Sequence, residues 1–176
     1  MFLCIDLKSF YASCECSMRG LDPFKTNLVV ADPSRGKGTI SLAVTPHLKS
    51  LGIKSRCRLY EIPEGINYII AKPRMRKYME FSSYIYNIYL DYFSEEDIHV
   101  YSIDEVFIDL NPYILLYGKS PKVIARMIMN EVYEKTNITA TCGIGTNLYL
   151  AITESLPDIL RTLLASLVLT KLVNSK

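Results

Sequence analysis

Three carboxylic acids stand where they could hold a metal ion. Asp104 and Glu105 are adjacent within residues 99–110, a run that otherwise has the composition of β-structure, and Asp6 follows the apolar run 2–5. Burying acids among strands costs free energy unless a cation or a hydrogen-bond network compensates their charge. Hard oxygen ligands that stay partly open to solvent suit Mg²⁺. The sequence therefore predicts a divalent-metal site built from these three acids.

The chemistry indicated by such a site is phosphoryl transfer. Two Mg²⁺ ions would stabilise the attacking and leaving oxygens of an in-line phosphoryl displacement. Taken alone, an Asp-Glu pair more often decorates a hairpin turn, where acids are common. The pairing of Asp104 and Glu105 with Asp6 in one sheet weakens that alternative.

The elements that must position these acids follow from hydrophobic periodicity. We expect strands at 2–5, 28–31, 98–103, 106–110 and 139–144, and helices at 7–18, 42–51, 74–92 and 121–135. This order predicts an α+β fold, a ferredoxin-like mixed sheet with helices on one face and an insertion. In that sheet the first strand is central and lies beside the hairpin. Asp6 should then meet Asp104 and Glu105 at one edge.

Two of the predicted helices carry local signals. Ser9 is the expected N-cap of the first helix. Pro121 after a serine is typical of the first turn of the last predicted helix. On that helix we expect Val123, Met127 and either Ile128 or Glu131 to face inward.

Composition narrows the class of protein. The 176 residues carry a net charge of +2, and the basic residues concentrate between Lys37 and Lys77, which predicts either a binding stripe or a solvated face. Five cysteines without a CxxC pair, together with no secretory signal, indicate reduced thiols in a cytoplasmic protein. The longest apolar stretch, 163–169, is too short to cross a bilayer, so no membrane partner is expected.

Three segments in order resemble one family. Residues 6–15 read DLKSFYASCE, residues 102–105 read SIDE, and residues 142–151 read CGIGTNLYLA. Together they resemble the Y-family translesion DNA polymerases, in particular the UmuC-type bacterial branch with its UV-damage repair proteins. Three motifs at family-like spacing are far more specific than one. The resemblance covers about residues 1–151.

The resemblance implies roles for individual residues. Asp6, Asp104 and Glu105, with the backbone carbonyl of Leu7, match the ligands of two Mg²⁺ ions. Tyr11 matches the steric gate, an aromatic ring that clashes with a ribose 2′-hydroxyl and passes deoxyribose. Without the family, Tyr11 is more typical of a core aromatic on an amphipathic helix. The neighbouring Phe10 either lines the nucleotide pocket or belongs to the core.

The resemblance also implies subdomains. Residues 1–33 and 74–151 match the palm, and residues 34–73 match the small fingers subdomain that holds the triphosphate. Where the family has a Tyr and an Arg on the fingers helix, this chain has Pro46 and Lys49. Lys49 gives a point charge and no bidentate fork. Thr45, Lys49 and Arg56 (or Arg58) are the expected triphosphate contacts, and a solvated Lys49 is an equal alternative.

The resemblance stops after Ala151. The family continues with lysine where this chain has Ile152, and residues 152–176 form a leucine-rich stretch with a helical stripe. We therefore expect a polymerase chain that is truncated before the thumb and little finger, with 152–176 as a helical tail outside the family pattern.

The function expected from the resemblance is that of a DNA-directed DNA polymerase in DNA damage repair and the SOS response. Its partners would be dNTP, primer-template DNA and possible repair accessory proteins, with weak activity for the isolated chain. One alternative is a non-catalytic remnant that binds nucleotide, DNA or a repair partner. A remote alternative is a GGDEF-type nucleotide cyclase, whose hairpin motif differs from Ser-Ile-Asp-Glu-Val-Phe at 102–107.

Overall fold

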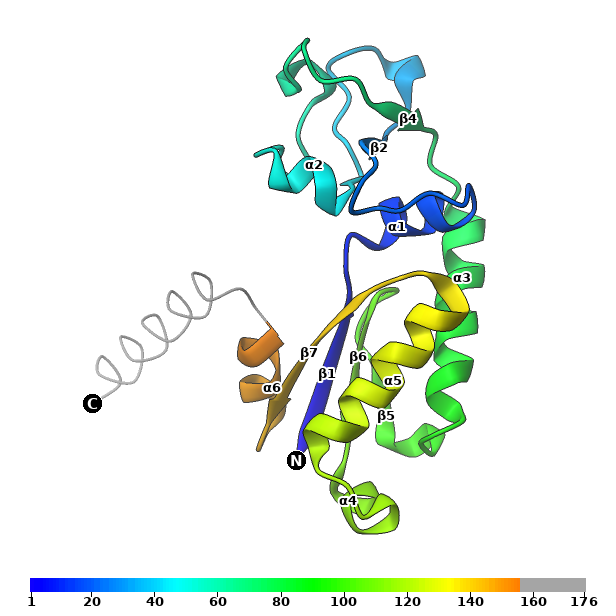
Figure 1. Ribbon diagram of the computed structural model, residues 1–176, viewed down its shortest axis with the longest axis vertical. Coiled ribbons are helices and arrows are strands. Elements are labelled where there is room, and N and C mark those ends of the chain that lie inside the picture. Colours follow the sequence, from blue (N-terminus) through cyan, green and yellow to red (C-terminus); the bar gives the residue numbers. More distant parts are fainter. Residues whose placement is uncertain (156–176) are drawn as a thin grey trace, which may run out of the picture. The chain divides into compact units, whose positions relative to one another are not determined.

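The computed structural model describes residues 1–155, which form two compact units (Figure 1). The first unit is built from Met1–Asp6, Tyr89–Asn130 and the described residues from Ala140 onward. The second is built from Leu7–Ile88 and Glu131–Thr139. The boundaries of these two units differ from those expected for the palm (1–33 and 74–151) and the fingers (34–73). The division into palm and fingers therefore stays a prediction. The greater part of the expected tail, residues 156–176, lies outside the described residues.

A four-stranded sheet forms the centre of the first unit. Its strands lie in the order β5-β6-β1-β7 (Figure 1), and they span Ile98–Val100 (β5), Glu105–Asp109 (β6), Phe2–Leu7 (β1) and Ala140–Gly145 (β7). β6 pairs antiparallel with both β1 and β5. The α+β class is confirmed, as is the central place of the first strand beside the hairpin.

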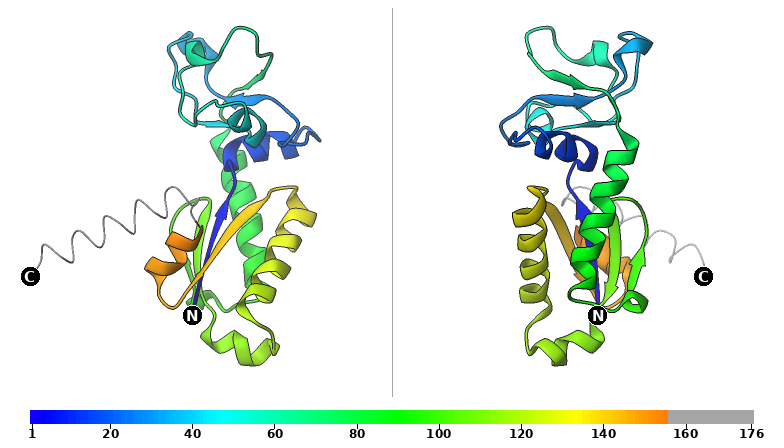
Figure 2. Two further views of the ribbon diagram at one scale, coloured as in Figure 1. Left: turned by 60° about the vertical axis from the view of Figure 1, so that its left-hand side comes forward. Right: turned by 90° about the vertical axis from the view of Figure 1, so that its right-hand side faces the viewer.

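The helix α6 (Leu148–Ser155) packs directly on this sheet. It lies against β7 (Figure 2), and its buried Ala151 contacts Cys4 and Phe107. Ile152 packs against the same cluster. Cys4 and Phe107 are register partners, and because side chains alternate along a strand they share a sheet face with Asp6. Ile152, which stands where the family has lysine, thus contributes an apolar contact at this face.

The close approach of α6 requires a glycine in β7. A Cβ atom built on Gly145 would lie 2.4 Å from the backbone nitrogen of Ala151. We therefore expect Gly145→Ala to lower the free energy of unfolding by about 3 kcal/mol, because the clash is with backbone that cannot rotate away. Urea denaturation measures this. Gly65→Ala is the matched control, since nothing lies within 4 Å of a Cβ there; equal losses in both variants would contradict the expectation.

Two further helices contribute residues to both units. α3 spans Met75–Leu90 and α5 spans Pro121–Thr136, close to the predicted ranges. The inward face predicted for α5 is partly wrong: Val123 is 46% exposed. The buried residues include Ile124, Ile128 and Val132, which recur every four residues, and Ala125 and Thr136 are buried as well. The buried stripe is therefore shifted by one residue from the predicted one, and α4 (Asn111–Tyr117) was not predicted.

The second unit contains a three-stranded sheet in the order β3-β2-β4. β2 (Leu28–Val30) pairs antiparallel with β3 (Ala43–Val44) and parallel with β4 (Ile69–Ala71). The helix predicted for 42–51 is wrong in its first half, because only Pro46–Ser50 (α2) is helical. Proline disfavours the helical conformation in the residue before it, which keeps the preceding chain extended.

The first helix of the chain, α1 (Phe10–Ser17), belongs to this unit and lies beside β2 (Figure 2). Ser9 stands at its N-cap position, but the expected side-chain cap is absent. The backbone of Ser9 is left-handed, with φ 48° and ψ 42°, whereas a side-chain cap needs extended backbone at that residue. Within residues 1–155, no helix is long and apolar enough to cross a membrane.

Candidate active site

The structure brings Asp6 and Glu105 together. They are register partners in the antiparallel pair of β1 and β6, near the end of one strand and at the start of the other. Directly opposite residues of such a pair have Cβ atoms about 5 Å apart, and like charges there destabilise the sheet. Both side chains are half-buried. A cation between them would relieve this repulsion.

Asp104 occupies the turn before β6, where Ser102 orients it. The hydroxyl of Ser102 donates a hydrogen bond to Oδ1 of Asp104 over 2.7 Å. The backbone amides of Tyr101 and Ser102 both donate to the carbonyl oxygen of Glu105, at 3.0 and 3.1 Å. The turn is therefore tightly closed. Glu105 itself is the first residue of the strand and not a turn residue.

Two neighbouring side chains contact the paired acids. The Cys4 thiol donates to Oε1 of Glu105 over 3.4 Å. The Thr141 hydroxyl, from β7, lies 3.3 Å from the carbonyl oxygen of Asp6 and 3.5 Å from its Oδ2. Burial, reinforced by the charge of Asp6, raises the pKa of Tyr89. Thr141 and Cys4 were not predicted as site residues, because only the register of the three strands places them here.

The donor set fits Mg²⁺ in chemistry, since three carboxylates and the carbonyl of Leu7 at the end of β1 are hard oxygen ligands. The side chains as they stand do not converge: among residues 1–155 no group of three or more His, Cys, Asp or Glu side chains is arranged to hold a metal ion. The hydrogen bond from Ser102 engages one oxygen of Asp104. The three-acid metal site therefore stays a prediction, supported by the pairing of Asp6 with Glu105.

The predicted gate residue lies in the second unit on α1. The Tyr11 side chain is half-buried, so part of it reaches the surface. Its ring centroid lies 5.0 Å from that of Tyr78 and 5.7 Å from that of Phe10. Phe10 is only 2% exposed. Of its two alternatives, burial favours the core for Phe10 and leaves Tyr11 as the ring that a ligand can touch.

The three expected triphosphate contacts differ in what they can offer. Thr45 is fully buried, its hydroxyl donates to the carbonyl of Thr26 over 2.7 Å, and it accepts from the amide of Leu28. Its one proton is therefore used, and Thr45 has none left for a phosphate, which is a correction to the sequence prediction. Lys49 is exposed on α2. Arg56 is exposed and lines a cavity of about 480 Å³ whose other cationic residues are Arg35 and Lys72.

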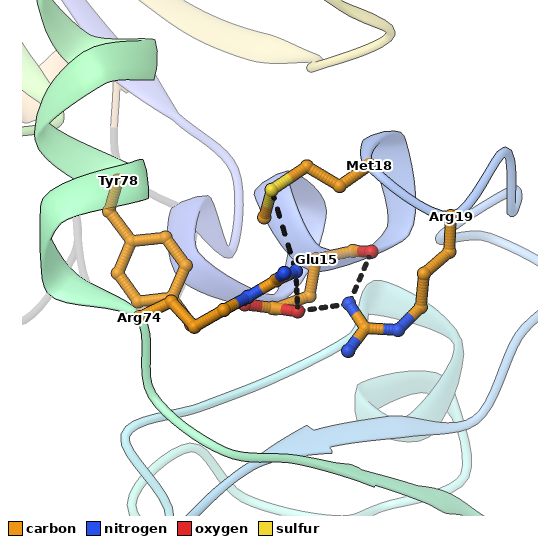
Figure 3. A network of polar contacts seen from close by, with 5 residues as sticks. All are labelled: Glu15, Met18, Arg19, Arg74 and Tyr78. Atoms are coloured by element: carbon orange, nitrogen blue, oxygen red, sulfur yellow. Dashed lines mark hydrogen bonds and ion pairs between the residues drawn. The ribbon is translucent and has the colours of Figure 1, made fainter.

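A buried carboxylate network in the second unit was missed from sequence (Figure 3). Glu15 of α1 is fully buried and accepts two hydrogen bonds from Arg74, at 3.0 and 2.7 Å. It also accepts from the Tyr78 hydroxyl over 2.8 Å and forms an ion pair with Arg19. Burial acts to raise the pKa of Glu15, but the hydrogen bonds from Arg74, Arg19 and Tyr78 outweigh it, and the pKa is lowered. The available signal was an acid four residues after Tyr11 in an apolar helix.

Comparison with known proteins gives a consistent family. The family model described as impB/mucB/samB matches residues 5–153. The chain is similar to the UV-damage repair protein UvrX of Bacillus subtilis (strain 168), at 35% identity over 150 residues that cover 85% of this chain and 35% of that protein. It is also similar to the DNA repair protein homolog YozK of the same strain, at 39% identity over 103 residues that cover 58% of this chain and 90% of that one.

Solved structures support the same grouping. A chimera of the Y-family DNA polymerases Dbh and Dpo4 matches with a TM-score of 0.75 and 25% identity, covering 88% of this chain and 45% of the chimera. DinB from Sulfolobus solfataricus matches with a TM-score of 0.71 and 26% identity, covering 88% of this chain and 44% of that one. The chain thus spans less than half of these polymerases and about a third of UvrX.

Proposed function

Because the chain belongs to the impB/mucB/samB family, whose solved neighbours are Y-family DNA polymerases, we propose that it carries the nucleotidyl-transfer site of a translesion DNA polymerase. The primer 3′-hydroxyl would attack the α-phosphate of a dNTP, and pyrophosphate would leave. The observation that carries this proposal is the pairing of Asp6 with Glu105 on adjacent strands, with Asp104 next to Glu105 in the chain.

The three acids of the first unit and the residue that follows Asp6 would bind the metal ions. Asp6, Asp104, Glu105 and the carbonyl of Leu7 would hold two Mg²⁺ ions. When bound, these ions would supply positive charge for the attacking and leaving oxygens. Ser102 would keep Asp104 in its turn through the 2.7 Å hydrogen bond to Oδ1, so the other carboxylate oxygen, Oδ2, would be the one that binds a cation.

The second unit would hold the nucleotide. Tyr11 would exclude a ribose 2′-hydroxyl by steric clash. Lys49 and Arg56, both exposed, would contact the triphosphate as cations. Thr45 has no part here because its hydroxyl bridges two backbone groups. Primer-template DNA would be the second substrate.

We expect the 176-residue chain by itself to insert single nucleotides weakly and to lack processive synthesis. DNA affinity depends mainly on phosphate contacts from cationic groups, and the net charge here is only +2. The alternative function is that of a non-catalytic protein that binds nucleotide or DNA. It also predicts the absence of processive synthesis, but it predicts that no nucleotide is inserted at all.

A primer-extension assay under single-turnover conditions tests the proposal. The chain, an undamaged primer-template and one dNTP should give a one-nucleotide product with Mg²⁺ and none with EDTA. Asp104→Ala should remove that product. Insertion that persists in Asp104→Ala would contradict the assignment of the acids. Binding of dNTP without any insertion would favour the non-catalytic alternative.

A further inference from the structure

Tyr78 links the proposed gate residue to the buried carboxylate. Tyr11 and Glu15 stand four residues apart on α1 and so share one side of that helix. Tyr78 of α3 contacts both, since its ring centroid lies 5.0 Å from that of Tyr11 and its hydroxyl donates to Oε1 of Glu15 over 2.8 Å. The Tyr78 side chain therefore packs against the side of α1 that carries both Tyr11 and Glu15.

The position of the Tyr78 ring is defined at both of its ends. Its backbone belongs to α3, and its hydroxyl is held by a carboxylate that is itself fixed by two hydrogen bonds from Arg74 (Figure 3). Arg74 precedes α3 directly, so α1 and the start of α3 are joined by the ion pair as well as by the tyrosine. A ring held in this way can move little against its neighbours.

The two tyrosines differ in exposure. Tyr78 is 0% exposed and cannot meet a ligand, whereas Tyr11 is half-buried and can. The planes of the two rings are inclined by 47°, so the half-buried Tyr11 ring packs against a ring that is itself fully buried. To reject one hydroxyl group by steric clash, the Tyr11 ring must stay in place, because a shift of well under 1 Å already relieves much of a van der Waals clash.

We propose that Tyr78, anchored through its hydroxyl by Glu15, is a positioning residue that holds the Tyr11 ring and so sets how strongly the site rejects ribonucleotides. The inference rests on the proposed function of Tyr11 as the gate. It assigns the buried network a part in substrate selection in addition to its part in stability.

The test measures discrimination between dATP and ATP. The full chain is titrated calorimetrically with each nucleotide, in Mg²⁺ and with a primer-template whose primer ends in a dideoxynucleotide. We expect wild type to prefer dATP at least tenfold, and Tyr11→Ala to abolish the preference. Tyr78→Phe, which removes only the hydroxyl, should reduce the preference about threefold, and Tyr78→Leu, which also removes the ring, should reduce it further. In both, the change should come from tighter ATP binding.

Tyr113→Phe is the matched control. Tyr113 is also a buried tyrosine whose hydroxyl donates to a carboxylate, Oδ2 of Asp97 at 2.6 Å, but it lies on α4 in the first unit. The Tyr113→Phe variant should lose stability as Tyr78→Phe does, but it should keep the wild-type preference for dATP. A loss of preference in this control would show that any weakened tyrosine has the effect, and would overturn the inference.

The outcomes separate the inference from the function on which it rests. If Tyr11→Ala abolishes the preference and both Tyr78 variants keep it, the role of Tyr78 is overturned and the gate stands. If wild type shows no preference, or Tyr11→Ala does not change it, the gate fails and the role of Tyr78 fails with it. Should the Tyr78 variants not fold, NMR of wild type decides: slow flipping of the Tyr11 ring supports the inference, and fast flipping overturns it.

Discussion

Asp6→Asn is expected to reduce single-nucleotide insertion about a thousandfold while making the protein slightly more stable. Asparagine keeps the shape of the side chain but removes the charge that the proposed metal ions need, and a loss of about 4 kcal/mol of transition-state stabilisation corresponds to this factor. In EDTA, the free energy of unfolding should rise by about 0.5 kcal/mol, because Asp6 and Glu105 are directly opposite and their like charges repel.

Insertion activity and the free energy of unfolding, measured together, test the proposed metal site more strictly than either does alone. Adding Mg²⁺ should raise the unfolding free energy of wild type and leave that of Asp6→Asn nearly unchanged, as ligand linkage requires. Asp109→Asn is the control on β6, the strand that pairs with the strand of Asp6, because Asp109 is opposite the apolar Phe2. It should change insertion less than twofold and show no gain of stability in EDTA. A stability loss in Asp6→Asn without metal would contradict the proposed repulsion.

The pairing of the acids was predictable because it depends on strand order and alternation alone. Once the first strand is central and the hairpin lies beside it, Asp6 must meet the start of the second hairpin strand. The predicted convergence of Asp104 with this pair is not seen in the side chains as they stand, because the orientation of Asp104 depends on the turn and on the hydrogen bond from Ser102, which strand order does not determine. Periodicity also failed on α5, where Val123 and Ile124 are both apolar and the sequence does not decide which faces inward.

The contacts within the second unit were harder to predict from the sequence, because they join residues that lie far apart in the chain. Glu15 and Arg74 are 59 positions apart, and no local pattern connects them. The pairing of β2 with β4 likewise joins segments about forty residues apart and was not predicted. Thr45 was assigned to the triphosphate because its hydroxyl could donate, but burial between Thr26 and Leu28 uses that hydroxyl for the backbone.

Glu15→Gln is expected to lower the free energy of unfolding at pH 7 by about 3 kcal/mol, measured by urea denaturation. The variant leaves Arg74 and Arg19 without the buried charge that they share, and breaking a buried ion pair costs about 3–5 kcal/mol. The lower end applies because the side chains of Arg19 and Arg74 are 33% and 44% exposed and can be hydrated. Glu80→Gln is the control, since Glu80 pairs with Lys77 on the exposed side of α3; it should change stability by less than about 0.5 kcal/mol.

The dependence of stability on pH should identify the charge of Glu15 as the cause. The pKa of Glu15 is lower in the folded protein than its usual value, so the folded state binds fewer protons there than the unfolded state. Its contribution is complete above the unfolded pKa of about 4.3 and is lost as the pH falls through the folded pKa. The difference in unfolding free energy between wild type and Glu15→Gln should therefore shrink below about pH 4. A difference that stays constant down to pH 3 would show that the loss comes from packing, and the ion network would then have no stabilising charge effect.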